Sequence, residues 1–212
     1  MSRKTIIFDF DGTIADSFDL TVSIFFDVLH RKPITDPKQV RAYRRMSLQE
    51  LIREFRVPRL LLPFLLMRGK HIMHKRIAEV GVFEGVNEVL HELHEAGCRL
   101  LIISSNSQKN VTTFLDTNHL LQYFDRVYGG VGLFGKTGAL RRAIITDKLR
   151  NKDCYYVGDE VRDIEAARRA RVKIVSVAWG YNDPEALEKH SPFALVQKPK
   201  DLIPLFLDNE QE

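Results

Sequence analysis

Short apolar runs with the composition of β-strands alternate with segments of helical periodicity along most of this chain. In one such helical segment, apolar side chains recur at positions i, i+3, i+4 and i+7, namely Val86, Val89, Leu90 and Leu93. Strands that alternate with helices indicate an α/β fold in three layers, a parallel sheet covered by helices on both faces. The predicted strands are Thr5–Phe10, Arg99–Ser104, Arg126–Tyr128, Cys154–Val157 and Lys173–Val177. The predicted helices between them are Val86–Ala96, Lys109–Asn118, Thr137–Leu149 and Asp163–Ala170, and a final helix and a short edge strand are expected after residue 183.

The alternation is interrupted between the first two predicted strands, where residues 16–82 show only helical patterns. The sequence Ser47–Glu50 has the form of a capping box that opens a helix, and a further helix is predicted from Leu65 to Ala78. The apolar stretch Leu60–Met67 is expected to form the core of a helical bundle, with a membrane or partner surface as the alternative. The chain is therefore predicted to carry an all-α insert immediately after its first strand.

Composition is that of an ordinary globular protein, but charge is distributed unevenly. The 212 residues carry a net charge of +4, and residues 37–80 hold eleven Lys or Arg against three Glu, so the remainder is net acidic. A basic segment suggests an anionic ligand, with a solvated helical face as the alternative. No apolar run reaches the length of a membrane span, and no signal peptide is evident before the first strand. With two cysteines, Cys98 and Cys154, we expect reduced thiols in a cytoplasmic protein.

The first predicted strand ends in two carboxylates, a glycine and a hydroxyl, which are Asp9, Asp11, Gly12 and Thr13. Aspartate disfavours strands and a buried unpaired carboxylate is costly, so a bound cation is the simplest explanation of the pair. Side chains alternate along a strand, which would direct Asp9 and Asp11 to the same side. This arrangement suits a divalent metal beside a carboxylate nucleophile, whereas an ordinary strand-to-turn junction is the alternative.

Polar groups also follow the other predicted strands, and ligands of open parallel sheets bind beyond these ends. Ser105 and Asn106 follow the second strand, where hydroxyl and backbone N–H groups can hold a phosphate or simply cap a helix. Lys136 follows the third strand after a glycine-rich turn. Asp159 and Asp163 follow the fourth strand at i, i+4 spacing, which suits a metal ligand and its neighbour, or acidic residues that favour the helix dipole.

The order of these motifs resembles that of the haloacid dehalogenase superfamily. The motifs are Asp9-x-Asp11-Gly-Thr, then Ser105, then Lys136, then Gly158-Asp159-x3-Asp163. The stretch Val157–Ala167 is particularly similar to the phosphoglycolate phosphatase-like branch. The resemblance implies a Rossmann-like catalytic core, residues 1–15 and 83–212, with a small α-helical cap, residues 16–82, inserted after the first motif.

The resemblance also implies a role for each motif residue in a phosphatase. Asp9 would attack phosphorus and form an aspartyl-phosphate, while Asp11 would protonate the leaving oxygen and then activate water. Ser105 and Lys136 would hold phosphoryl oxygens as charge develops. Asp11 favours phosphoester cleavage over dehalogenation, because dehalogenases of the family lack this second aspartate.

The cofactor implied by the resemblance is Mg²⁺. Its ligands would be the Asp9 side chain, the Asp11 backbone carbonyl and Asp159, since Mg²⁺ prefers oxygen ligands and keeps several waters. Asp163 would orient Lys136 or a metal-bound water.

The substrate is expected to be a small anionic phosphorylated metabolite selected by the cap. Thr13 and Asn106 are expected to contact it from the core. Arg44 and Arg45 lie in the segment that corresponds to the specificity loop of related caps, and they would bind a second anionic group, with surface arginines as the alternative. Phosphoglycolate, a doubly phosphorylated molecule or pyrophosphate would fit. A phosphomutase remains open because mutases keep Asp11, although they carry Glu-Asp where this chain has Gly-Asp.

Two other classes of function compete with a phosphatase. The stretch Gly130–Thr137 fits the P-loop pattern of nucleotide-binding proteins, but that interpretation leaves Asp9, Asp11 and Ser105 without a role. The basic insert could bind nucleic acid or a protein. It has no recognised nucleic-acid-binding motif and few aromatic residues among its charges, so a nucleic-acid partner is not expected. The short apolar runs also give no reason to expect a membrane partner.

Overall fold

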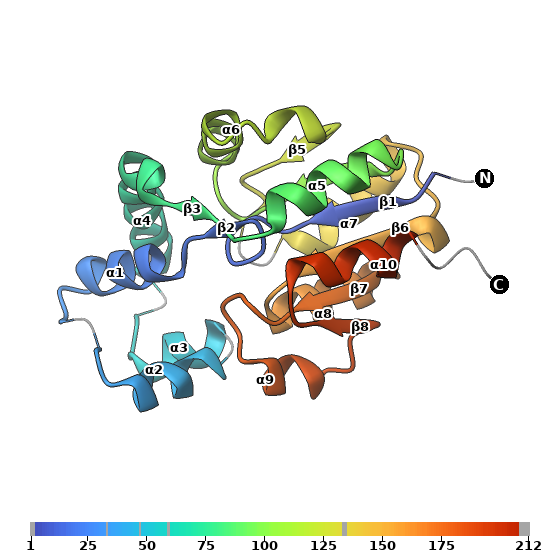
Figure 1. Cartoon of the computed structure of the whole chain (residues 1–212). Helices are drawn as coiled ribbons and strands as arrows, with labels where there is room; N and C mark the ends of the chain where they lie inside the picture. Colours follow the sequence, from blue (N-terminus) through green and yellow to red (C-terminus); the bar gives the residue numbers. More distant parts are fainter. Residues whose placement is uncertain (1–2, 33, 47, 59, 133–134, 208–212) are drawn as a thin grey trace.

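A six-stranded parallel sheet forms the centre of the computed structural model (Figure 1). The structure describes residues 3–32, 34–46, 48–58, 60–132 and 135–207. The strand order is β5-β4-β1-β6-β7-β8, and every neighbouring pair is parallel. The strands are β1 (Thr5–Phe8), β4 (Arg99–Ile103), β5 (Arg126–Tyr128), β6 (Cys154–Gly158), β7 (Lys173–Val177) and β8 (Ala194–Val196). The expected α/β fold is therefore confirmed, including the short edge strand near the C-terminus.

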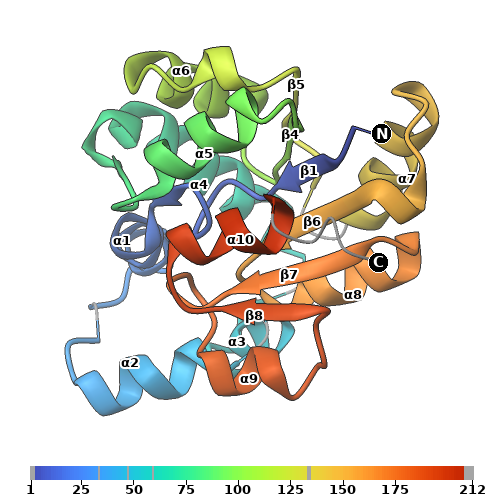
Figure 2. The ribbon, with the colours of Figure 1, turned by 45° about the vertical axis from the view of Figure 1, so that its right-hand side comes forward.

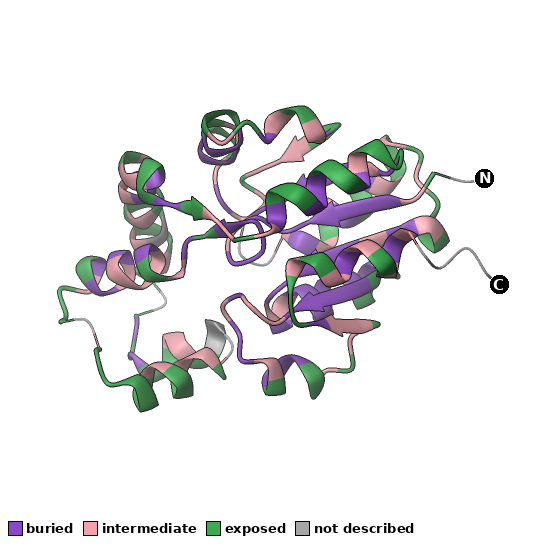
Figure 3. Cartoon of the chain, viewed as in Figure 1, coloured by how far each residue is buried: buried purple, intermediate pink, exposed green. Residues whose placement is uncertain are grey.

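Helices cover both faces of the sheet, because apolar side chains alternate between the two faces of each strand (Figure 2). In β1, Ile6 and Phe8 pack against one group of helices and Ile7 against the other. The first layer contains α5 (Val86–Glu95), α6 (Gln108–Thr117) and α10 (Leu202–Leu207), and the second contains α7 (Lys136–Thr146), α8 (Val161–Ala170) and α9 (Pro184–Glu188). Single 3-10 turns lie at η2 (Leu121–Tyr123), η3 (Asn151–Asp153) and η4 (Pro199–Asp201). Figure 3 shows that the central strands are buried while the outer helices expose one side.

A helical segment, residues 18–79, lies beyond the carboxyl ends of the strands (Figure 1). It contains α1 (Phe18–Val28), α2 (Pro37–Arg44), α3 (Leu48–Glu54), α4 (Leu62–Arg76) and η1 (Ile77–Glu79). The chain enters it through β2 (Ala15–Asp16) and leaves it through β3 (Gly81–Val82), and these short strands pair antiparallel. Entry and exit therefore lie side by side just after β1, which positions the helices over the strand ends.

The apolar stretch around the start of α4 differs from the expected bundle core. Leu60 and Met67 are 95% and 63% exposed, and Leu61 and Phe64 are exposed as well. Leu65, on another face of the helix, packs against the core. The prediction that the whole stretch forms a core is therefore wrong for these four exposed residues.

Two further expectations concern the starts of helices. Ser47 of the predicted capping box lies outside the described residues. Helix α4 begins at Leu62, earlier than predicted, with Pro63 in its first turn. Proline is tolerated there because N–H groups of the first turn make no intrahelical hydrogen bonds. None of the described helices has both the length and the apolar character needed to cross a membrane.

Candidate active site

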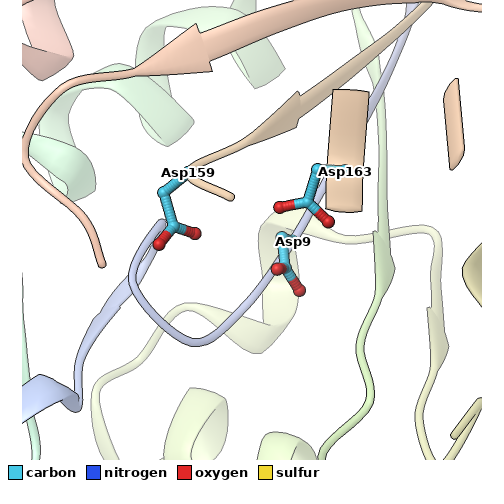
Figure 4. Close-up of side chains that lie close together, drawn as sticks. All are labelled: Asp9, Asp159 and Asp163. Atoms are coloured by element: carbon cyan, nitrogen blue, oxygen red, sulfur yellow. The ribbon is translucent and has the colours of Figure 1, made fainter. Parts of the chain in front are cut away.

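Three buried aspartates meet at the carboxyl ends of two neighbouring strands, β1 and β6 (Figure 4). Asp9 follows β1, Asp159 follows β6, and Asp163 lies in the first turn of α8. One carboxylate oxygen from each residue lies within 4.8 Å of the other two. The sheet order thus brings residues about 150 positions apart to one point, as the strand-end rule anticipates.

Lys136 supplies a positive charge to this aspartate cluster. It is the first residue of α7, and its buried ammonium donates hydrogen bonds to Asp9 and, at 2.5 Å, to Asp163. Burial acts to lower the pKa of Lys136, but the Asp163 and Asp9 carboxylates outweigh burial and raise this pKa above its usual range. Lys136 is therefore protonated, and carboxylates hold it from two sides.

Lys136 also belongs to the predicted P-loop, Gly130–Thr137, of which residues 133–134 lie outside the described part of the chain. Its ammonium is directed to Asp9 and Asp163. This pairing argues against the nucleotide-binding interpretation, in which the lysine would serve a phosphate held by its own loop.

Asp159 is oriented by groups from two other strand ends. Its Oδ1 accepts a hydrogen bond from Thr13 Oγ1 at 2.8 Å, and its Oδ2 accepts one from the backbone N–H of Tyr181 at 2.7 Å. Gly12 has φ +79°, and a Cβ there would lie 2.2 Å from Asp159 Oδ2, so this close approach requires glycine. Thr13 is 1% exposed. Its hydroxyl therefore orients Asp159, and its expected contact with substrate stays a prediction.

The charge balance of the cluster fits a divalent cation. Three carboxylates, those of Asp9, Asp159 and Asp163, lie together, and Lys136 pairs with two of them. Arg162 adds a second positive charge nearby, but it also pairs with the carboxylate of Glu160. Burial, opposed by Lys136, raises the pKa of Asp9 from 3.8 to about 7. Burial and the neighbouring charges of Glu160 and Asp9 raise the pKa of Asp159 well above its ordinary value. A hard cation would relieve this repulsion, and a set of carboxylate oxygens matches the preference of Mg²⁺.

The carboxylate of Asp11 does not belong to the aspartate cluster and has its own hydrogen bonds. Its carboxylate accepts from Ser17 Oγ at 2.9 Å and from Asn106 Nδ2 at 3.1 Å, and the hydroxyl of Tyr181 lies 2.9 Å from Ser17 Oγ. Burial raises the pKa of Asp11, while the bonds from Ser17 and Asn106 oppose the rise. A carboxyl group with a raised pKa and a fixed orientation suits proton transfer. Asn106 thus orients Asp11, and its expected contact with substrate stays a prediction.

A chain of hydrogen bonds with a defined direction connects Asp11 to helix α4. The backbone N–H of Ser107 donates to Asn106 Oδ1 at 2.9 Å, so Asn106 Nδ2 is the atom that faces Asp11. Asn110 Nδ2 also donates to Asn106 Oδ1 at 2.9 Å, which leaves Asn110 Oδ1 to accept from His74 Nδ1 at 2.7 Å. The backbone N–H of Ser107 thus determines the direction of the bonds from Asp11 to His74, and this direction requires a proton on His74 Nδ1.

A cavity of about 350 Å³ opens beside Asp11, between the core and the helical segment. Ser105, which is half-buried, and Asn106 line it from the core. Arg44 lines it from α2, and its guanidinium stacks on Phe18, 3.8 Å from the centre of the ring. The carboxylate expected to transfer protons and the hydroxyl expected to hold phosphate therefore face the same space.

Arg45, the neighbour of Arg44, takes part in ion pairs that join the helical segment to the core. It lies 2.8 Å from Glu185 and 3.5 Å from Asp183, and Arg41 lies 3.2 Å from Asp183. Carboxylates of the core thus pair with Arg45, which is not among the residues that line the cavity, and its role in substrate binding stays a prediction. These ion pairs of Arg45 connect the end of α2 to the start of α9.

Several side chains of the site were not anticipated from the sequence: Ser17, His74, Asn110, Arg162 and Tyr181. Tyr181 follows β7, so the rule that ligands bind at strand ends already pointed to this position. Arg162 lines the cavity and pairs with Glu160 at 2.5 Å. The others carry no distinctive sequence signal, because hydroxyl and amide groups are common near helix starts.

With divalent cations removed by a chelator, we expect stability to fall as the pH rises from about 4 to about 7. The pKa of Asp9 is about 7 in the folded protein against 3.8 in the unfolded chain, so the folded state binds more protons in this range. Mg²⁺ at about 100 times its Kd should add about 2.7 kcal/mol at pH 8. The gain should be small at pH 5, where protons compete for the carboxylates. The measurement is Tm at both pH values, with and without Mg²⁺.

The matched variants for this measurement are Asp159→Asn in the cluster and Asp16→Asn, an exposed aspartate of β2. Asp159→Asn should lose the Mg²⁺-dependent gain in Tm, whereas Asp16→Asn should keep it. An equal gain in both variants would show that the cation binds elsewhere.

Comparison with known proteins agrees with the fold. The family model for haloacid dehalogenase-like hydrolases matches residues 6–177. The chain belongs to this family. This haloacid dehalogenase-like hydrolase is 33% identical over 204 residues to a phosphoglycolate phosphatase of Synechococcus elongatus, which covers 94% of this chain and 95% of that protein. It is 26% identical to the pyrophosphatase PpaX of Bacillus thuringiensis over 98% of both chains.

A solved structure supports the fold of the hydrolase independently. The crystal structure of a putative phosphoglycolate phosphatase from Lactobacillus plantarum superimposes with a TM-score of 0.82 and covers 97% of this chain and 100% of that one. The two sequences are 20% identical, so this similarity concerns the fold alone.

Proposed function

We propose that this hydrolase is a Mg²⁺-dependent phosphatase that acts on a small phosphorylated metabolite through an aspartyl-phosphate on Asp9. The observation that carries the proposal is that two carboxylates with different hydrogen-bond partners follow the same strand, β1. Asp9 lies in the metal-binding cluster beside Lys136, and Asp11 faces the cavity with donors that fix its orientation. The similarity to curated phosphatases supports the same class of reaction.

In this proposal the phosphoryl group of the substrate is transferred twice, first to Asp9 and then to water. Asp9 attacks phosphorus and the leaving alcohol takes its proton from Asp11. Asp11 then accepts a proton from the water that attacks the phosphoryl group on Asp9, which releases inorganic phosphate. Ser105 and Lys136 stabilise the phosphoryl oxygens by hydrogen bonding and charge. Asp9, the backbone of Asp11 and Asp159 would hold Mg²⁺, which would supply positive charge that reduces repulsion between nucleophile and phosphate.

The chain is divided in this proposal into a core, residues 1–15 and 83–212, and a cap, residues 16–82. The pairing of β2 with β3 supports this division, because it brings the start and the end of the insert together. Arg44 is the proposed site for a second anionic group, since it lines the cavity and has a planar guanidinium.

Two related activities use the same residues. A pyrophosphatase is favoured by the similarity to PpaX. A phosphomutase would use Asp9 and Asp11 in the same way but return the phosphoryl group to a sugar phosphate rather than to water.

The decisive experiment is a phosphate-release assay with a panel of substrates, with Mg²⁺ or with chelator. The panel contains phosphoglycolate, aryl and alkyl phosphates, sugar phosphates and pyrophosphate. We expect release from at least one monoester, dependent on Mg²⁺. Isomerised sugar phosphate without phosphate release would indicate a mutase, release from pyrophosphate alone would indicate a pyrophosphatase, and no turnover of the panel would contradict the proposal.

His74→Ala is expected to lower kcat by about threefold to tenfold, the effect of one hydrogen bond, with little change in KM. The substitution removes the donor that orders Asn110, and through Asn106 the orientation of Asp11. Steady-state kinetics with the best substrate of the panel provide the measurement.

Two other substitutions in α4 test whether this effect comes from the hydrogen bond. His74→Asn offers an N–H in place of Nδ1–H and should recover most of kcat, whereas His71→Ala, an exposed histidine of the same helix, should match the wild type. Equal losses in His74→Ala and His74→Asn would mean that His74 acts through packing instead.

A further inference from the structure

The cavity beside Asp11 is walled mainly by apolar side chains of the helical segment. Val22, Phe25, Tyr43 and Leu51 come from three different helices, and each of them is only half-buried. They pack on one side against the buried cluster of Phe26, Phe55 and Val57. On the other side they border a common space, so part of their apolar surface is available for an apolar ligand.

The position of Asp11 determines which part of the substrate reaches this surface. The proposed role of Asp11 is to protonate the leaving oxygen, and the organic group of the substrate is bonded to that oxygen. Since Asp11 itself lines the cavity together with Val22 and Phe25, the organic group extends from Asp11 into the apolar space. The phosphate, bound at Asp9, remains on the side of the buried aspartate cluster.

The volume and chemistry of the cavity exceed what phosphoglycolate requires. Between its phosphate and its carboxylate, phosphoglycolate has a single methylene to place against an apolar wall. A cavity of about 350 Å³ lies in the range of pockets that enclose whole organic ligands, roughly 300–1,000 Å³. Burial of an apolar group against apolar walls makes the free energy of binding more favourable by about 0.8 kcal/mol for each methylene, or about fourfold in affinity.

We propose that the substrate is a phosphomonoester of an apolar alcohol, with an aryl or medium-length alkyl group that occupies this cavity. This inference rests on the proposed phosphatase function and specifies its substrate class. Arg44, which also lines the cavity, remains available to an anionic substituent on the same group.

The test compares kcat/KM along a series of unbranched alkyl phosphates from propyl to octyl, with phosphoglycolate measured alongside. From propyl onward the leaving alcohols have nearly the same basicity, so the trend reports on the cavity rather than on the leaving group. We expect kcat/KM to rise by about fourfold for each methylene that enters the cavity, and to exceed the value for phosphoglycolate. A flat or falling series with active enzyme would overturn this inference and leave the phosphatase function intact. If no member of the series and no other phosphate ester is hydrolysed, the proposed function fails and the inference fails with it.

Substitutions in α4 locate the effect. Leu65 lines the cavity. Met67, two residues further along the helix, is exposed and does not belong to the lining. Leu65→Trp should reduce the octyl-to-propyl ratio of kcat/KM by at least about tenfold, since the indole displaces two or more methylenes. Met67→Trp should retain the wild-type ratio. If Leu65→Trp lowers Tm strongly, Leu65→Phe replaces it, and an unchanged ratio in a folded Leu65 variant overturns the inference.

Discussion

Asp9→Asn is expected to lower kcat for phosphate release by at least about 10⁴-fold, the scale on which loss of a nucleophile acts. An amide cannot form the acyl phosphate, and it removes one of the three carboxylates that can hold the metal. The substitution preserves the size of the side chain, and Lys136 keeps its hydrogen bond to Asp163. Because burial disfavours the charged form of Asp9, Tm at pH 8 without metal should stay the same or rise. Turnover and Tm are measured on the same preparation.

The matched control for this variant is Asp16→Asn, in an exposed position seven residues along the chain. It should keep near wild-type turnover. Full activity of folded Asp9→Asn would rule out the proposed nucleophile and, with it, the aspartyl-phosphate mechanism.

Lys136→Met is expected to lower stability by about 3–5 kcal/mol, because it leaves two buried carboxylates without their shared cation. Both partners, Asp9 and Asp163, lie within hydrogen-bonding distance of the ammonium and are buried. Turnover should fall as well, by about 10²- to 10³-fold, since a group that stabilises developing phosphoryl charge is lost. Urea unfolding at pH 8 and the phosphate-release assay provide the two measurements.

The double variant Asp9→Asn/Lys136→Met separates the two effects. Neutralising Asp9 removes one unpaired charge, so the double variant should recover part of the lost stability while it remains inactive. Lys109→Met, an exposed lysine of α6, should change neither quantity. Wild-type stability in Lys136→Met would show that the ion pairs with Asp9 and Asp163 are not required by the fold.

Local patterns were sufficient to predict the sheet and the residues at its ends. The apolar run that predicted Thr5–Phe10 as a strand forms β1, which ends two residues earlier, although the N–H of Asp9 still donates to the carbonyl of Val157 at 2.8 Å. Proximity of Asp9 and Asp159 followed from the rule that parallel strands present their carboxyl ends at one edge. These features depend on periodicity and on the polarity of single residues, which a sequence displays directly.

The direction in which a polar side chain points was beyond such reasoning. Thr13 and Asn106 were expected to contact the substrate, and only the structure shows that they hydrogen-bond to Asp159 and Asp11. Arg44 and Arg45 are adjacent in sequence, yet one lines the cavity and the other pairs with Glu185 of α9. A hydrogen bond depends on angles and on distances of a few tenths of an ångström, which only the packed chain determines.

The sequence by itself determined the class of the protein: an α/β sheet with a helical insert, and an acidic and basic set of groups at its strand ends. It did so because hydrophobic periodicity and motif order are local properties of the chain. Tertiary structure alone decided which carboxylates share Lys136, how His74 is connected to Asp11, and how wide a space the helices leave beside them. Those features arise between residues far apart in sequence, where small shifts in packing decide whether groups touch or leave a cavity.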